Sequence, residues 1–211
     1  MDCTICHDEH HILNPKTGMY RECECLRVKR HRRKLVEAGV PKYMLNMTWK
    51  EWKDSHPGSA LAADNARAWA QKAHSHVNRC FGLCGSSGSG KLTLAYLMVR
   101  ECVTAKMSAK VVTISELVQD RWKDDTLITE ALDADVLCMR LGMEESHKWT
   151  TSFLERVHFG RKVDHKPTIY TMRSQGENFE EKYGDVLYKV FWTAKRDVEI
   201  WDLSDGLQVV A

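Results

Sequence analysis

Beyond residue 79, short apolar runs alternate with stretches in which apolar residues recur at helical spacing. The apolar runs have the length of buried strands and cover residues 80–84, 110–114, 135–141, 167–172 and 197–203. The stretches with helical spacing cover residues 92–106, 115–122, 151–159 and 179–194. Strands that alternate with helices predict an α/β fold, in which a parallel sheet is covered by helices on both faces.

The composition changes twice along the chain and predicts three regions. Residues 1–26 are rich in cysteine and histidine and are expected to form a small metal-binding module. Residues 27–58 are expected to be a basic helix and a linker, which breaks at the sequence Ser-His-Pro-Gly-Ser at its end. Residues 59–211 contain the alternating strands and helices and are expected to be the main domain.

The eight cysteines occur in two settings. Four of them lie in apolar stretches, where they are expected to be small core residues: Cys80, Cys84, Cys102 and Cys138. The other four form two close pairs near the amino terminus: Cys3, Cys6, Cys23 and Cys25. In a reducing compartment, close pairs of this kind indicate metal ligands rather than disulfides.

The two pairs have the patterns Cys-x2-Cys and Cys-x-Cys, and sixteen residues separate them. Four thiolates in such pairs can surround a zinc ion tetrahedrally at about 2.3 Å each. No ligand position then stays open, so the zinc is expected to be structural and to supply most of the folding free energy of the module. His7, His10 and His11 are alternative ligands, one of which could replace Cys25. The competing interpretation is four free thiols on a disordered tail.

A basic segment follows the cysteine pairs, and tryptophans follow the basic segment. The basic residues are Arg27, Lys29, Arg30, Arg32, Arg33 and Lys34. They can contact phosphates or an acidic partner, but a solvated helix face is the simpler interpretation, and the net charge of the chain is only +2. Any contact with nucleic acid is expected to be independent of base sequence and sensitive to salt. Trp49, Trp52 and Trp69 can stack on bases, but their spacing by helical turns is more typical of a core or an interface.

A glycine-rich loop follows the first strand of the main domain and opens the next helix. It consists of Gly85, Ser86, Ser87, Gly88, Ser89, Gly90 and Lys91, with Leu92 and Thr93 directly behind it. This is the G-x4-G-K sequence of a phosphate-binding loop. Its glycines let backbone amides surround phosphates, and its lysine reaches the outer phosphates of a nucleotide. ATP or ADP is therefore the expected ligand.

The residue after the lysine departs from the pattern. A phosphate-binding loop supplies Ser or Thr at that position to hold magnesium, whereas this chain has Leu92. Thr93 is one residue further, about 100° around the helix, so its hydroxyl is expected to point away from the metal. The sequence thus favours nucleotide binding and gives little support for a bound Mg²⁺.

The order of these features resembles that of the bacterial and phage helicase loaders of the DnaC type, which are AAA+ proteins related to the transposition ATPase IstB. The likeness extends from Cys3 to about Tyr188 and includes the sequence Glu-Ala-Gly-Val-Pro-Lys-Tyr at 37–43. It implies an AAA+-like P-loop domain behind a zinc or helicase-docking module. It also implies a partner, the hexameric replicative helicase, which such loaders place on single-stranded DNA.

The positions that serve hydrolysis in this family carry other residues here. The family's second acidic motif ends in Asp-Glu, which hold magnesium and orient the attacking water, whereas Met139 and Arg140 occupy those positions. Arg140 can pair with a phosphate or with Glu144 or Glu145.

Three later positions depart as well. Met172 and Arg173 replace the Ser-Asn pair of the sensor strand, and Lys189 is the nearest cation where the family has an arginine finger. Residues 201–207 contain no Gly-x-x-Arg sensor. An arginine finger alone is worth about 10³–10⁵ in rate, so losing several such groups predicts little or no hydrolysis.

The sequence thus favours a helicase-loader-like DNA replication accessory protein that binds a replicative helicase and ATP or ADP without significant hydrolysis. Single-stranded DNA, bound without sequence preference, is a second expected partner. Three alternatives stay open: an active loader whose metal site is assembled differently, a decoy that inhibits loading, and a zinc-containing nucleic-acid-binding protein with an inert P-loop.

A cytoplasmic location without membrane contact is expected. No apolar run approaches the ~18–20 residues that a helix needs to span a bilayer. Residues 1–11 lack the basic and apolar regions of a secretory signal.

Overall fold

The computed structural model describes residues 3–75, 79–120, 124–142, 148–173, 176–193, 198–203 and 207–210. Glu144 and Glu145, which were candidates to pair with Arg140, lie outside these residues. The end of the helix expected over 115–122 lies outside them too.

The main domain is built on a six-stranded sheet in the order β4-β5-β6-β3-β7-β8. Its strands are β3 (Cys80–Cys84), β4 (Ala109–Thr113), β5 (Val136–Arg140), β6 (Thr168–Thr171), β7 (Val198–Asp202) and β8 (Leu207–Val210). The first five strands in this order are parallel, which confirms the predicted sheet, and β8 adds an antiparallel edge strand that the sequence did not predict. The order places β3, which leads into the glycine-rich loop, between β6 and β7.

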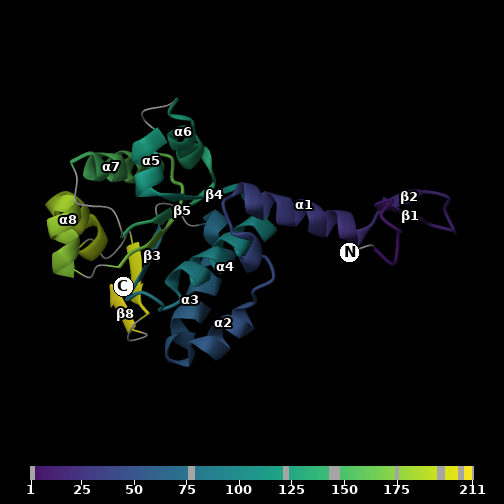
Figure 1. The fold of residues 1–211 in the computed structure, drawn as a ribbon, viewed down its shortest axis with the longest axis horizontal. Helices are drawn as coiled ribbons and strands as arrows, with labels where there is room; N and C mark the ends of the chain where they lie inside the picture. Colours follow the sequence, from purple (N-terminus) through teal and green to yellow (C-terminus); the bar gives the residue numbers. More distant parts are fainter. Residues whose placement is uncertain are drawn as a thin grey trace.

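Helices cover both faces of this sheet, as the alternating pattern predicted (Figure 1). They are α1 (Glu24–Glu37), α2 (Trp49–Ser55), α3 (Ala60–Gln71), α4 (Lys91–Thr104), α5 (Ile114–Asp120), α6 (Thr126–Asp133), α7 (Lys148–Val163) and α8 (Gly176–Tyr188). Helices α2, α3 and α4 pack with the carboxyl end of α1 on one face, and α5 to α8 pack on the other. The helix expected over 179–194 kinks at Gly184 (φ 84°) and ends in a π-helical turn, Lys189–Thr193.

The two faces follow from side chains that alternate along each strand. In β3, Phe81 and Leu83 point into the core under α4, whereas Cys80 and Cys84 point into the core under α7 and α8. All five residues of β3 are buried, as expected for a central parallel strand covered on both sides. The buried Cys80, Cys84, Cys102 and Cys138 are core residues, as predicted.

The tryptophan-rich segment folds onto the main domain. Trp49, Trp52 and Trp69 are buried in the same core as α4, which confirms the prediction of core positions over base stacking. Helix α2 begins at a capping box, in which Thr48 and Glu51 each accept a hydrogen bond from the backbone N–H of the other. The indole of Trp49 also donates to Glu101 of α4 at 2.6 Å.

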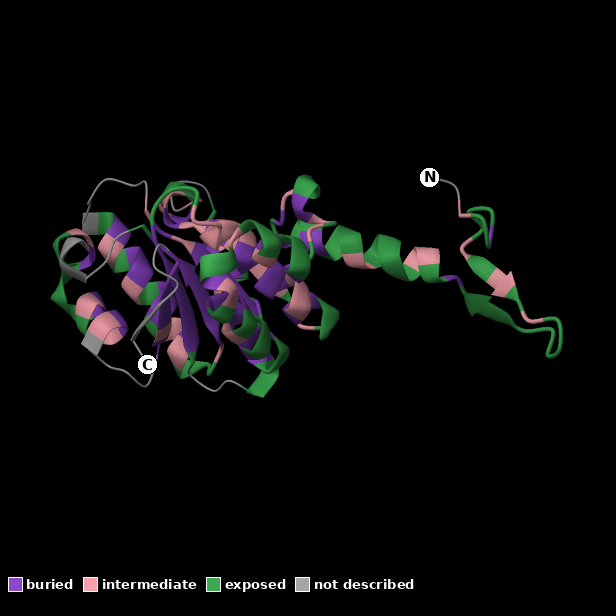
Figure 2. Cartoon of the chain, turned by 90° about the horizontal axis from the view of Figure 1, so that it is seen from below, coloured by how far each residue is buried: buried purple, intermediate pink, exposed green. Residues whose placement is uncertain are grey.

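The amino-terminal module lies at the far end of α1 from the main domain (Figure 2). It contains a small antiparallel hairpin of β1 (His11–Leu13) and β2 (Tyr20–Glu22). Helix α1 follows directly, is about 21 Å long, and is exposed along most of its length. Leu35, near the carboxyl end of α1, is the residue of this helix that is buried. The rest of the helix therefore separates the module from the sheet. Within the described residues, no helix has the length and apolar composition needed to cross a membrane.

Candidate functional site

Four parallel strands end around a cavity of about 510 Å³ at the carboxyl edge of the sheet. The glycine-rich loop follows β3, Thr113 ends β4, Arg140 ends β5 and Thr171 ends β6, and all of these line the cavity. Ligands in parallel α/β sheets bind at this edge, because the loops that follow the strands converge there. The cavity is therefore the candidate ligand site.

The glycine-rich loop has the backbone conformation of a phosphate cradle. Gly85, Gly88 and Gly90 all have positive φ, at 137°, 86° and 78°. Gly90 stands at the amino-terminal cap of α4, so the backbone N–H groups of its first turn open toward the loop. Side chains would be strained at these positions, which explains why the sequence alternates glycine with serine.

Two residues of the tryptophan-rich segment support the loop from behind. The indole of Trp52 donates to the carbonyl of Gly90 at 3.0 Å, and the ring of His56 stacks on Trp52 with centroids 4.6 Å apart. A Cβ atom at Gly90 would lie 2.6 Å from Nε2 of His56. His56 also lines the cavity, a role that the sequence did not predict because the contact joins segments far apart in the chain.

Lys91 lies at the mouth of the loop, as the sequence predicts. Its Nζ donates to the carbonyl of Ser86 at 2.7 Å, and burial lowers the pKa of the ammonium. The positive charge of Arg173 lowers this pKa further, whereas Asp202 acts in the opposite direction. An anion beside Lys91 would relieve the repulsion between the two cations.

Met139 and Arg140 stand where the sequence resemblance implies the two carboxylates of a hydrolytic site, and Arg173 adds a further cation. Met139 is buried, and Arg140 lines the cavity at the end of β5. Arg173, which follows β6, also lines it and donates to the hydroxyl of Ser87 at 3.4 Å. The described residues that line the cavity include no Asp or Glu.

The cavity offers cations and the backbone N–H groups at the start of α4 to a phosphate chain, and its described lining offers a magnesium ion hydroxyls but no carboxylate. Leu92 packs partly against the hydrophobic core and has no oxygen to offer, and Thr93 is a lining residue whose orientation toward a metal stays a prediction. Neither Met139 nor Arg140 is a ligand for a hard cation, which prefers oxygen. Lys189, the expected nearest substitute for an arginine finger, forms an ion pair with Asp185 at 2.9 Å.

The cysteines of the amino-terminal module form a second candidate site. The Sγ atoms of Cys3, Cys6, Cys23 and Cys25 all lie within 4.8 Å of one another. Cys3 and Cys23 are 3.8 Å apart, close to the ~3.8 Å that bonds of 2.3 Å give between ligands of a tetrahedral zinc. Cys6 and Cys25 are 3.3 Å apart. The four thiols can therefore hold a metal ion.

The surroundings of these thiols shift their pKa values in both directions. Hydrogen bonds from the backbone of Cys6 and Ile5 lower the pKa of Cys3 to about 6, so this thiol ionises near neutral pH. Burial raises the pKa of Cys25. The ring of His10 lies 3.5 Å from Cys25, but the metal-capable group among the described residues consists of the four cysteines without His7, His10 or His11.

The basic segment lies on α1, and acidic neighbours partly neutralise it. Arg27 pairs with Glu24 at 2.6 Å, and Arg30 pairs with Glu22 at 2.5 Å. Arg33 is 3.5 Å from Glu37. Exposed pairs of this kind contribute about 0–1 kcal/mol each, so the arginines stay available to an acidic partner. The predicted roles of Lys29, Arg32 and Lys34 stay predictions.

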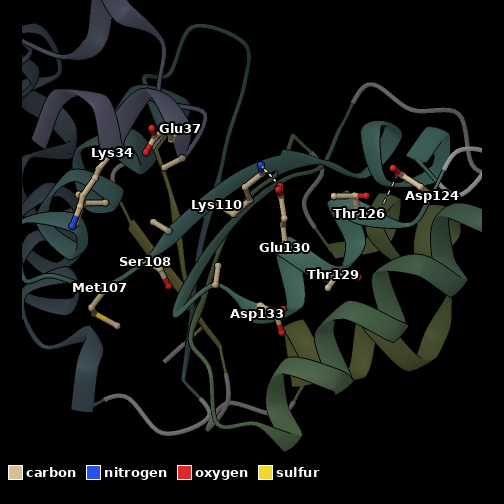
Figure 3. Close-up of a pocket in the computed structure, with 14 residues that line it drawn as sticks. Lys34, Glu37, Met107, Ser108, Lys110, Asp124, Thr126, Thr129, Glu130 and Asp133 are labelled. Carbon is tan, nitrogen blue, oxygen red and sulfur yellow. Dashed lines mark hydrogen bonds and ion pairs between the residues drawn. The ribbon is translucent and has the colours of Figure 1, made fainter. Parts of the chain in front are cut away.

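A second cavity of about 690 Å³ lies between the end of α1, the start of β4, and α6 (Figure 3). Lys34 and Lys110 line it together with Glu37, Glu130 and other carboxylates, and Lys110 pairs with Glu130 across it. Positive and negative groups alternate around this hollow. It therefore lacks the uniform charge of the cavity beside the glycine-rich loop.

Solved structures match this chain in fold, although no family model and no curated protein matches its sequence. The DnaC helicase loader superimposes with a TM-score of 0.58 and 18% identity, over 69% of this chain and 89% of that one. A protein described as a primosome component from Streptococcus pyogenes serotype M3 gives 0.63 and 15%, over 80% and 94%. AMPPCP-bound DnaA from Aquifex aeolicus gives 0.54 and 16%, over 63% and 44%.

These likenesses agree with the topology. In all of them the identity is below 20%, so they report the fold and leave activity open. The parallel sheet with its P-loop after a central strand matches what the sequence resemblance implied. The chain has the fold of the solved DnaC helicase loader, a parallel sheet with the glycine-rich loop after a central strand, together with an amino-terminal cysteine cluster that can hold a metal ion.

Proposed function

We propose that the chain is a helicase-loader-like replication accessory protein, which binds a hexameric replicative helicase and ATP or ADP and hydrolyses little or no nucleotide. The observation that carries this proposal is the cavity beside the glycine-rich loop. Its glycine-rich loop has positive φ at its three glycines, and Leu92, Met139 and Arg140 stand where the resemblance implies magnesium ligands and the catalytic glutamate. The cavity suits a nucleotide that is held rather than cleaved.

We expect no significant hydrolysis because the groups that are missing here each have a large effect on the rate of phosphoryl transfer. Phosphoryl transfer is catalysed almost wholly by positioning and by charge neutralisation, and an arginine finger alone is worth about 10³–10⁵ in rate. Leu92, Met139 and Arg140 together remove the protein ligands for magnesium and the group that orients water. One missing group can be bypassed, but the joint loss leaves negligible turnover.

The amino-terminal module and α1 are the proposed docking elements for the helicase. Zinc is the proposed metal, because four thiolates in closed tetrahedral geometry are its typical structural site. The module lies at the far end of α1 from the main domain, and most residues of this helix are exposed, so both are accessible to a large partner. The nucleotide domain then serves as scaffold or sensor, in the cytoplasm and without membrane contact.

The proposal predicts a stable complex with the replicative helicase of the same cell or phage. Native mass spectrometry of the purified pair is expected to show this chain bound to the hexamer. Replacing Arg30 and Arg33 by glutamate reverses charge on the exposed face of α1 and is expected to weaken the complex about tenfold or more. Arg156→Glu, an exposed change on α7, is the control and is expected to leave it unchanged. Recovery of the chain without any helicase contradicts the proposal.

The missing hydrolytic groups also favour a second function, that of a decoy which inhibits helicase loading. A chain that occupies the helicase but cannot complete a nucleotide cycle acts as a decoy, and a loading assay on single-stranded DNA separates the two roles. The loader-like role predicts more helicase on DNA when this chain is added. The decoy predicts less, in competition with an active loader.

A further inference from the structure

Building on the proposed nucleotide binding, we propose that Arg140 and Arg173 take the place of the magnesium ion. The cavity then selects the metal-free form of a nucleoside triphosphate, and Mg²⁺ weakens the binding. In most P-loop proteins the ion strengthens binding, because it bridges the outer phosphates and the protein. The inference goes beyond the loss of magnesium ligands, since it assigns a task to two arginines that stand where the resemblance implies the water-orienting glutamate and the asparagine of the sensor strand.

The sheet brings the two arginines to the same end of neighbouring strands. Arg140 pairs in register with Thr171 of β6, and Arg173 follows two residues later. The backbone N–H of Leu141 donates to the carbonyl of Thr171 at 2.7 Å, which ties the two strand ends together. The guanidinium groups therefore approach the cavity from adjacent elements, with Lys91 beyond them on the helix that follows β3.

The chain directs Arg173 toward the loop. Gly142 has a φ of 143°, and a Cβ atom there would lie 3.3 Å from Cγ of Arg173, so the stem of the arginine crosses close to this glycine. Its Nη2 then reaches the hydroxyl of Ser87 at 3.4 Å. A guanidinium in this position can donate to the phosphate chain that the loop surrounds.

Charge decides which form of the ligand fits. Lys91, Arg140 and Arg173 supply three cations, and no Asp or Glu is among the described residues that line the cavity. The carboxylate of Glu116 accepts hydrogen bonds from the lining residue Thr113. Asp202 acts on Lys91 but is not a lining residue. A fully ionised triphosphate neutralises this field, and planar guanidinium groups bind its oxygens in pairs. Magnesium bound to the triphosphate would withdraw those oxygens and bring positive charge next to the arginines.

The test is calorimetric titration of the full chain with ATP and with inorganic tripolyphosphate, each in excess chelator and in excess Mg²⁺. Both probes are expected to bind about tenfold or more tightly without the metal. Tripolyphosphate separates recognition of the phosphates from recognition of the nucleoside. Equal or tighter binding in Mg²⁺ overturns the inference and leaves nucleotide binding in place, whereas no binding in either condition overturns both.

Arg140→Met and Arg173→Met assign the effect to its residues. A charge-assisted hydrogen bond is worth about 10- to 100-fold in affinity, so each change is expected to weaken metal-free binding by that factor. The affinity measured in excess Mg²⁺ is expected to change less. In each variant the affinities with and without the metal therefore differ by a smaller factor than in the unaltered protein. Arg156→Met on the exposed face of α7 is the matched control, and thermal melting shows that every variant is folded. Arginine variants that fold and keep the full metal difference contradict the assignment.

Discussion

A chain in which Cys6 and Cys25 are both replaced by serine is expected to bind no zinc and to lose the folded structure of the amino-terminal module. The module contains a short hairpin, and among its described residues Cys6 and Cys23 are the buried ones, so neither hydrophobic cluster of the main domain extends into it. Structural zinc contributes about 10–16 kcal/mol in small units of this kind. Removing two of its four ligands therefore removes the main source of folding free energy.

Metal analysis and limited proteolysis measure this effect. The unaltered chain is expected to carry one zinc per molecule, to show a thiolate charge-transfer band with cobalt, and to resist cleavage before α1. His11→Ala, an exposed change in the same hairpin, is the control and is expected to keep the metal. A double serine variant that retains stoichiometric zinc, or an unaltered chain without a thiolate band, contradicts the assignment.

Arg161→Met is expected to lower the free energy of unfolding by about 3–5 kcal/mol. Arg161 of α7 is 1% exposed, and burial lowers its pKa to about 10, so it stays charged at neutral pH. Its guanidinium satisfies oxygens on three segments: Ala131, Leu132, Ala134, Asp135, Pro167 and Thr168. Methionine fills part of the volume but removes these donors. Leu132 keeps the ammonium of Lys166 and Pro167 keeps the N–H of Leu137, whereas each buried oxygen that loses its last donor costs about 1–3 kcal/mol.

Urea unfolding followed by circular dichroism measures the loss. The free energy of unfolding of Arg161→Lys is expected to lie between those of the unaltered protein and Arg161→Met, because an ammonium has fewer donors than a guanidinium and lacks its planar fork. Arg156→Met on the exposed side of the same helix is expected to stay within about 0.5 kcal/mol of the unaltered protein. A methionine variant at position 161 as stable as this control shows that the carbonyls find other donors.

Much of the main domain is predictable because its signal is local. Strand β3 is a short apolar run that ends at a glycine-rich loop, and β5 is a run bounded by polar residues. Such runs separated by helical stretches determine a parallel sheet, since parallel strands need crossover connections. The added edge strand β8 is a mostly apolar run of four residues, and only four residues separate it from β7 in the sequence, so it does not follow the alternation of strands and helices.

The position of the tryptophan-rich segment on the main domain depends on contacts between residues that are far apart in the sequence. The spacing of Trp49 and Trp52 indicates a helix with a buried side, but not the surface that covers it. The structure shows that this surface is α4, and that Trp52 and His56 pack against Gly90. Pairs so far apart in the sequence leave no periodic pattern.

The candidate site also combines parts that a local sequence pattern predicts with parts that only the fold reveals. The glycine-rich loop and the cysteine pairs have fixed spacings, because each must surround a ligand with consecutive residues. The cation cluster has no such spacing, since Lys91, Arg140 and Arg173 meet only through the order of the strands. Arg140 is identifiable in the sequence as a departure from an acidic motif, but only the fold shows that it lines one cavity with Arg173, which itself donates to Ser87.

The proposed role of this chain is to hold a nucleoside triphosphate and leave it intact. The rate of phosphate release from ATP is the measurement that decides this. The measurement uses saturating ATP and Mg²⁺ with helicase and single-stranded DNA present, and Lys91→Ala supplies the background. The account predicts release no faster than this background, with intact ATP recovered from the protein. Mg²⁺-dependent release above about 1 min⁻¹ that Lys91→Ala abolishes would contradict it.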